Sequence, residues 1–312
     1  MNFPENKFKR GLASGATQYG LWLGLPDNSV AEIAAGVGFD WLLIDHEHGP
    51  YELANVLANL QAIAAYDVAP IVRPVDDNPA LLKRLLDMGA QSFLIPMVET
   101  AEQAVAIVAA LRYPPAGKRG LGTSMARAAR WNGVPDYLAR ANAELCLIVQ
   151  VETASALANL DAILAVDGVD GVFIGPSDLS ASMGHLGDPG HPDVVNAIND
   201  GLARIIAAGK YAGLLCLDSA LVAQYRARGA HFIGVGVDAV VLANGLRQPA
   251  TTRRRPPATK GGHRLPEAVS KTSSVALGVI FETASGTWQR SAGLFRSAAS
   301  PSRHTAPPDR GT

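Results

Sequence analysis

Eight short apolar segments alternate with eight helical patterns along the first 248 residues of this 312-residue chain. The apolar segments are rich in Val, Ile and Leu and have almost no polar alternation, which is typical of parallel strands covered on both faces. They are Tyr19–Gly24, Trp41–Asp45, Ala69–Pro74, Ser92–Glu99, Leu145–Glu152, Gly171–Pro176, Tyr211–Asp218 and His231–Asp238. The helical patterns are Val30–Val37, Leu53–Ala64, Asn78–Met88, Ala101–Leu111, Ala154–Val166, Pro192–Ala208, Ser219–Ala227 and Val240–Leu246.

This strict alternation over about 235 residues predicts a single (β/α)8 domain, a TIM barrel. The alternative is an open, doubly wound parallel sheet. That fold commonly places a glycine-rich phosphate loop after its first strand, and the segment Gly24-Leu25-Pro26-Asp27 does not have that pattern. The sequence therefore favours the barrel.

Composition narrows the class of protein further. With 48% hydrophobic and 18% charged residues, the chain can bury a large core. No apolar run approaches the ~18 residues of a membrane span, and the start MNFPENKFKR lacks the apolar region of a secretion signal. Only two cysteines are present, Cys146 and Cys216, as expected for a reducing compartment. We therefore expect a cytoplasmic protein with no membrane contact.

The net charge of −1 hides two unlike regions. Residues 249–312 contain ten Lys and Arg against three Asp and Glu, a net +7, whereas residues 1–248 carry −8. The second region is rich in Ser, Thr, Ala and Pro, and only Ser274–Phe281 is apolar, so it cannot bury enough surface to order itself. We predict a barrel domain over 1–248 and a disordered or loosely attached tail over 249–312. A basic tail could bind nucleic acid, but we favour an appended segment without that role.

In a barrel, chemistry is expected where the strands end at their carboxyl sides. Glu152 and Asp178 follow the fifth and sixth strands, so their carboxylates can converge. Two carboxylates completed by water suit Mg²⁺, Mn²⁺ or Co²⁺. The alternative is that they pair with arginine or cap the following helix, which Asp178 could do.

The run Asp45-His46-Glu47-His48 follows the second strand, and Arg73 ends the third. His48 has a carboxylate three residues before it and another next to it, so it is a candidate general base. A competing hypothesis makes His46 and His48 the ligands of a zinc ion, although no third ligand is evident. A guanidinium at the position of Arg73 must pair with an anion, from the protein or from a substrate.

Four segments carry a resemblance to a known family. They are Leu43–Pro50 (LIDHEHGP), Lys118–Tyr137 (KRGLGTSMARAARWNGVPDY), 147–153 (LIVQVET) and 168–187 (GVDGVFIGPSDLSASMGHLG). They resemble the metal-dependent, class II pyruvate aldolases, which include 4-hydroxy-2-oxoheptanedioate aldolase and 2-keto-3-deoxy-L-rhamnonate aldolase. The resemblance covers roughly residues 5–247 and excludes the tail. It implies a TIM barrel, a homohexamer and a divalent metal.

The resemblance also implies roles for single residues. The metal ligands match Glu152 and Asp178, the base matches His48, and the arginine that stabilises the enolate oxygen matches Arg73. The substrate-binding positions match Gln150, Ser177 and Asp178, with the amides of the last two taking the pyruvate carboxylate. The acids that tune the histidine match Asp45 and Asp87, the second acting from a neighbouring subunit, although by pattern alone Asp87 is an ordinary surface acid. Two residues depart from the family: His46 stands where Gly is usual and Ser177 where many members have Ala.

We therefore expect an aldolase that forms or cleaves 4-hydroxy-2-oxo acids through an enolate of pyruvate or hydroxypyruvate. A rival mechanism is Schiff-base catalysis by Lys83 or Lys210, but neither lysine ends a strand. A rival of another class is a non-catalytic barrel that binds 2-oxo acids. Such a protein would be expected to lack part of the constellation, and the sequence contains all of it.

Overall fold

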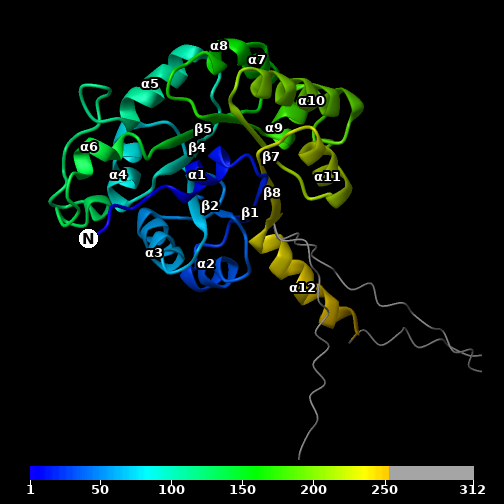
Figure 1. Ribbon diagram of the computed structural model, residues 1–312. Helices are drawn as coiled ribbons and strands as arrows, with labels where there is room; N and C mark the ends of the chain where they lie inside the picture. The colour runs from blue at the N-terminus through cyan, green and yellow to red at the C-terminus, as the bar shows by residue number, and fades with distance from the viewer. Residues whose placement is uncertain (253–312) are drawn as a thin grey trace, which may run out of the picture. The chain divides into compact units, whose positions relative to one another are not determined.

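The computed structural model describes residues 1–252. Their eight parallel strands form a closed barrel in which every strand pairs with its neighbours in sequence and β1 pairs with β8. The strands are β1 (Gln18–Leu23), β2 (Trp41–Asp45), β3 (Ala69–Arg73), β4 (Ser92–Ile95), β5 (Cys146–Val151), β6 (Gly171–Ile174), β7 (Tyr211–Leu215) and β8 (Phe232–Val237). Each lies inside a predicted segment or differs from it by one residue at its start, so the predicted (β/α)8 barrel is confirmed (Figure 1).

Helices surround the ring of strands (Figure 1). Those between or after strands are α2 (Asn28–Ala35), α3 (Leu53–Ile63), α4 (Pro79–Met88), α5 (Ala101–Leu111), α6 (Tyr137–Ala141), α7 (Ala154–Ala158), α8 (Leu160–Leu164), α9 (Pro176–Ser182), α10 (Pro192–Ala207), α11 (Ser219–Ala227) and α12 (Asp238–Thr252). The helix predicted over Ala154–Val166 is interrupted at Asn159, whose side-chain amide donates to the carbonyl of Glu99 at 2.9 Å. That bond to another loop fixes Asn159 at the junction of two short helices.

The N-terminal helix α1 (Lys7–Ala13) was not predicted, because only Phe8 and Leu12 mark its buried face. Phe8 packs edge-on against Trp41 and Phe232, at the first residues of β2 and β8. Helix α1 therefore closes the end of the barrel at which the strands begin (Figure 1). The opposite end, where the strands finish, is left for the candidate site.

Side chains inside the barrel form a packed floor beneath that end. Trp22, Trp41, Phe173 and Phe232 make a chain of ring contacts with centroids 5.5–6.3 Å apart. Such offset and edge-on contacts bury large apolar area at good density. A second apolar cluster lies between strands and helices, so each strand is buried on both faces as its composition predicted.

The end of the barrel domain is the last feature of the fold. Helix α12 continues to Thr252, past the predicted domain boundary at residue 248. Residues 253–312, including the apolar segment Ser274–Phe281, lie outside the described residues, so the proposed tail remains a prediction. Among the described helices, none is both long and apolar enough to cross a membrane.

Candidate active site

Arg73 is held at the carboxyl end of β3 by the residue that faces it across the sheet. Asp45 at the end of β2 is its register partner, and both side chains are buried. The Asp45 carboxylate accepts hydrogen bonds from Arg73 Nε at 2.9 Å and from Arg73 Nη2 at 2.7 Å. A bidentate pair of this kind fixes the plane of the guanidinium as well as its charge. Asp45 Oδ1 also accepts hydrogen bonds from the backbone amides of Glu47 at 3.2 Å and His48 at 3.3 Å, and these bonds fix the backbone of the loop after β2.

This arrangement bears on one expectation. Asp45 was predicted to orient the ring of His48, but its carboxylate contacts Arg73 and reaches His48 through the main chain. The carboxylate beside the ring is that of Glu47, whose Oε2 lies 3.8 Å from His48 Nε2 and 3.0 Å from Arg73 Nη1. Glu47 therefore links the guanidinium to the imidazole. The ring itself is open to solvent, with 68% of the side chain exposed.

Glu152, immediately after β5, is a carboxylate with 2% of its surface exposed. Its Oε1 accepts the amide of Met97 at 2.8 Å, and its Oε2 accepts a short hydrogen bond from the side chain of Gln150. Burial raises the pKa of the Glu152 carboxyl, these hydrogen bonds lower it, and the nearby charges of Asp178 and Glu47 raise it again. A cation near this buried carboxylate would favour its charged form, as the Arg73 guanidinium already does in part.

Asp178 and Ser177 lie in the first turn of α9, directly after β6, and both are exposed. The first amide of this helix to meet a helical acceptor is that of Leu179, which donates to Gly175 O at 3.0 Å. The amides of Ser177 and Asp178 come earlier and have no acceptor within the helix, so they can bind an anion such as a carboxylate. The charge of Asp178 raises the pKa of both Glu152 and Glu47, so the three carboxyl groups belong to one electrostatic environment.

The residues around Glu152 fit a divalent metal. A Cβ added to Gly175 would lie 2.7 Å from Glu152 Oε2 and 2.8 Å from Glu152 Cβ, so only glycine leaves the carboxylate its place. Within residues 1–252, Gln150 Oε1 is buried and has no hydrogen-bond partner. Carboxylate oxygens with an amide oxygen nearby are the hard ligands that Mg²⁺ and Mn²⁺ prefer.

Asp87 and the two candidate Schiff-base lysines lie elsewhere in the chain. Asp87 is near the end of α4, five residues before β4 begins, and pairs with Arg119 at 2.8 Å. Lys210 directly precedes β7 and donates to Val169 O at 2.7 Å, so it lies where strands begin. Lys83 belongs to α4 on the outside of the barrel. One chain therefore does not bring Asp87 to the site, and the geometry disfavours both lysines as nucleophiles.

Comparison with known proteins identifies the family of this chain. The model of the HpcH/HpaI aldolase/citrate lyase family matches residues 18–245, nearly three quarters of the chain. The chain belongs to this family. The chain is 60% identical over 248 residues to the hydroxypyruvate/pyruvate aldolase of Deinococcus radiodurans, covering 80% of this chain and 90% of that protein. It is 54% identical over 270 residues to the enzyme of the same name from Pseudomonas aeruginosa, covering 86% and 98%.

A solved structure of the HpcH/HpaI family agrees with the barrel. It is the crystal structure of an HpcH/HpaI aldolase/citrate lyase family protein from Burkholderia cenocepacia J2315. It has 41% sequence identity and a TM-score of 0.76, and the match covers 80% of this chain and all of that one. The resemblance found in the sequence is thereby confirmed at the level of the family.

Sequence reasoning missed three contributors to this aldolase-family site. Glu47 was noted only as a neighbour of His48, Met97 supplies a backbone amide from a left-handed residue with φ of 52°, and Gly175 makes room for Glu152. The two acids in the run DHEH were a usable signal for Glu47. The Met97 amide and the crowding at Gly175 depend on contacts between strands, so no local pattern reports them.

Proposed function

We propose that this chain is a metal-dependent aldolase that joins pyruvate or hydroxypyruvate to an aldehyde and cleaves the resulting 4-hydroxy-2-oxo acid in reverse. The observation that carries the proposal is the buried Glu152 carboxylate, on which the charges of Asp178 and Glu47 act, together with the ion pairs that join Arg73, Glu47 and His48. Membership of the HpcH/HpaI family and the names of the Deinococcus and Pseudomonas relatives support it.

Glu152 and Asp178 would hold the divalent ion, for which we propose Mg²⁺, Mn²⁺ or Co²⁺. When bound, the metal supplies Lewis acidity that polarises the keto group of the substrate. The protein places the substrate around that point. The amides of Ser177 and Asp178 would receive the carboxylate of the 2-oxo acid, and the side chain of Gln150, which lies beside Glu152 and Gly175, would bind the same substrate.

The proton is moved by His48. Its exposed imidazole takes a proton from the carbon next to the keto group, and the carboxylate of Glu47 stabilises the imidazolium that results. Arg73 meets the negative charge that develops on the enolate oxygen, with its guanidinium plane fixed in advance by Asp45. The enolate carbon then attacks the aldehyde carbon, the alkoxide that forms takes up a proton to become the 4-hydroxy group, and the imidazolium of His48 gives up the proton it had removed. The reverse sequence cleaves the carbon–carbon bond.

We propose that His46 influences which aldehydes the enzyme accepts. Its amide donates to Arg73 O at 2.9 Å, which ties its backbone to the end of β3. Among the described residues its Nδ1 is buried without a hydrogen-bond partner, and burial lowers the pKa of the ring. A neutral imidazole of this kind adds bulk and hydrogen-bonding capacity at a position where the family resemblance leads us to expect glycine. Aldehyde preference therefore has to be measured on this protein.

The proposal also covers the oligomeric state of the enzyme and its cellular compartment. Asp87 can act on His48 only from a second subunit, so we propose a homohexamer in which a neighbour supplies it. We also propose a cytoplasmic enzyme without a nucleic-acid or membrane partner. The alternative, a non-catalytic barrel that binds 2-oxo acids, would not need a chain of charged groups leading to an exposed histidine.

A panel of aldehydes incubated with pyruvate or hydroxypyruvate tests the function. Products are identified by mass as 4-hydroxy-2-oxo acids, with Glu152→Gln as the matched inactive control. New product with at least one donor, absent in the control, supports the aldolase. Binding of either 2-oxo acid without product from any aldehyde would support the non-catalytic alternative.

A further inference from the structure

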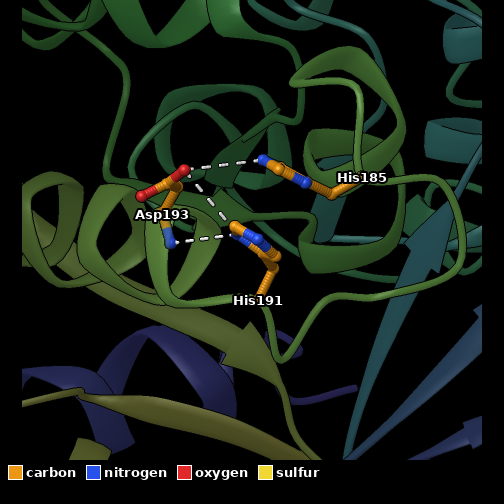
Figure 2. A group of neighbouring side chains, drawn as sticks. All are labelled: His185, His191 and Asp193. Carbon is orange, nitrogen blue, oxygen red and sulfur yellow. Dashed lines mark hydrogen bonds and ion pairs between the residues drawn. The ribbon is translucent and has the colours of Figure 1, made fainter.

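Beyond the end of α9, two histidines and an aspartate form a cluster that the aldolase chemistry does not use. His185 lies in the loop between α9 and α10, His191 precedes α10, and Asp193 stands in its first turn. Figure 2 shows the three side chains turned toward one another from the two ends of that loop. Asp193 Oδ2 lies 3.7 Å from His185 Nε2 and 3.7 Å from His191 Nδ1. One ligand atom from each residue lies within 4.8 Å of the others.

The loop holds these side chains in place through a series of backbone hydrogen bonds. The amide of His185 donates to Ser180 O at 2.7 Å, the amide of Asp188 to His185 O at 2.9 Å, and the amide of His191 to Asp188 O at 3.1 Å. Pro189 and Pro192 further restrict the chain on either side of His191. The backbone of such a loop requires little further ordering when the site binds a ligand.

The donor set differs in kind from that of the catalytic centre. Two imidazoles and one carboxylate form the three-ligand pattern of zinc sites that keep a fourth position for water. Imidazole nitrogen also suits Ni²⁺ and Cu²⁺, whereas Mg²⁺ prefers the oxygen ligands found at Glu152 and Asp178. We propose that His185, His191 and Asp193 form a second metal site, selective for Zn²⁺ and similar transition-metal ions.

The distances from the carboxylate to the two imidazoles are close to those of a zinc site, but the two rings must move apart. Ligands about 2.05 Å from a tetrahedral zinc ion lie about 3.4 Å apart, and the two measured separations of 3.7 Å are slightly longer. The imidazole rings are stacked, with centroids 3.6 Å apart and an angle of 14° between planes. An imidazole lone pair lies in the plane of its ring, and two stacked, nearly parallel planes offer no common metal position, so zinc binding must open the stack. It must also replace the long 3.3 Å hydrogen bond from the Asp193 amide to His191 Nδ1.

The accessibility of the cluster suits an exchangeable ion. The side chains of His185 and His191 are 27% and 33% exposed, and that of Asp193 is 67% exposed. Asp188 lies on the same exposed loop and adds negative charge near the cluster. A cation can therefore enter from solvent without unfolding any element. Because the three side chains are open to water, replacing one of them should leave the barrel folded.

The test counts zinc equivalents in the full-length protein by equilibrium dialysis at pH 8, followed by metal analysis. Glu152→Gln serves as the background, because it weakens the oxygen site. In that background His185→Ala and Asp193→Asn should each remove one equivalent of zinc. Asp188→Asn is the matched control, because it removes a charge from the same loop without touching a ligand, and it should retain the full count. Circular dichroism checks that every variant is folded.

A second readout uses Co²⁺, which absorbs visible light more strongly in tetrahedral nitrogen sites than in octahedral oxygen sites. The Glu152→Gln protein should show the intense band, and addition of His185→Ala should abolish it. If His185→Ala and Asp193→Asn both keep the zinc count and the band of the background, the proposal is wrong, and the role left to the cluster is the cap that His191 Nδ1 provides to α10. These readouts do not depend on turnover, so they stand or fall separately from the aldolase activity.

Discussion

Gly175→Ala is the substitution whose consequence follows most directly from the geometry. A Cβ at this position would lie 2.8 Å from Glu152 Cβ and 2.7 Å from Glu152 Oε2. Carbon atoms in contact prefer a separation of about 3.5–4.0 Å, so Glu152 must shift by roughly 1 Å. The added methyl also lies 3.2 Å from Gln150 Nε2, which closes one direction of relief.

Two effects of different size are expected from that shift. Overpacking of a buried site costs about 1–3 kcal/mol of folding stability, which a barrel of this size should survive. A misplacement of about 1 Å in a catalytic group costs on the order of 10²-fold in rate. Gly175→Ala should therefore remain folded, bind the metal more weakly and lose about two orders of magnitude in the exchange of pyruvate methyl protons with deuterated water.

Gly24→Ala is the matched control. Gly24 follows β1 at the same end of the barrel, but its added Cβ would meet only Asp238 Oδ1 at an ordinary 3.5 Å. It should keep wild-type exchange and metal affinity. If Gly175→Ala behaved like Gly24→Ala in both assays, Glu152 would not be the residue that positions the metal.

Three further substitutions test separately the roles proposed for His48 as base, for Arg73 as the group that stabilises the enolate oxygen, and for the buried Glu152. His48→Ala should retain metal but slow proton exchange by ~10²–10⁴; unchanged exchange would pass the role of base to His46. Arg73→Lys keeps the charge but loses the bidentate geometry, so exchange should fall by ~10²–10³ while metal affinity stays near wild type, and equal loss of both would give Arg73 a structural role instead. Burial raises the pKa of Glu152, which favours its neutral form in the folded state, so the metal-free protein loses stability as pH rises through that raised pKa. Glu152→Gln removes this penalty, so with chelator present it should melt above wild type at neutral pH, by a margin that shrinks as pH falls toward the ordinary glutamate pKa; a margin independent of pH would contradict the assignment.

The barrel could be predicted from sequence because its signal is local and repeated. Parallel strands buried on both faces must be continuously apolar, and each of the eight segments reports that condition by itself. Helix α1 could not be predicted because it is short. Its only buried apolar side chains, Phe8 and Leu12, contact β2 and β8 rather than residues nearby in sequence.

The sequence predicts where the residues of the candidate site lie, but not which side chains pair with one another. The rule that barrel chemistry lies where strands end led to Asp45, His48, Arg73 and Glu152 without any structure. Proximity in sequence suggested that Asp45 orients the His48 ring. The register between β2 and β3 instead sets Asp45 opposite Arg73, and the bidentate bond then occupies its carboxylate. The register between neighbouring strands determines which side chains pair, and the spacing of residues along one strand does not predict that register.

Metal-dependent enolisation is the central claim, and exchange of pyruvate methyl protons with deuterated water, followed by NMR without any aldehyde, tests it most directly. The account predicts that EDTA abolishes exchange by the wild-type protein and that Mg²⁺, Mn²⁺ or Co²⁺ restores it. It also predicts that prior treatment with pyruvate and borohydride leaves exchange intact. Exchange that resists EDTA, together with a borohydride-dependent mass adduct on Lys83 or Lys210, would contradict the account and establish Schiff-base catalysis instead.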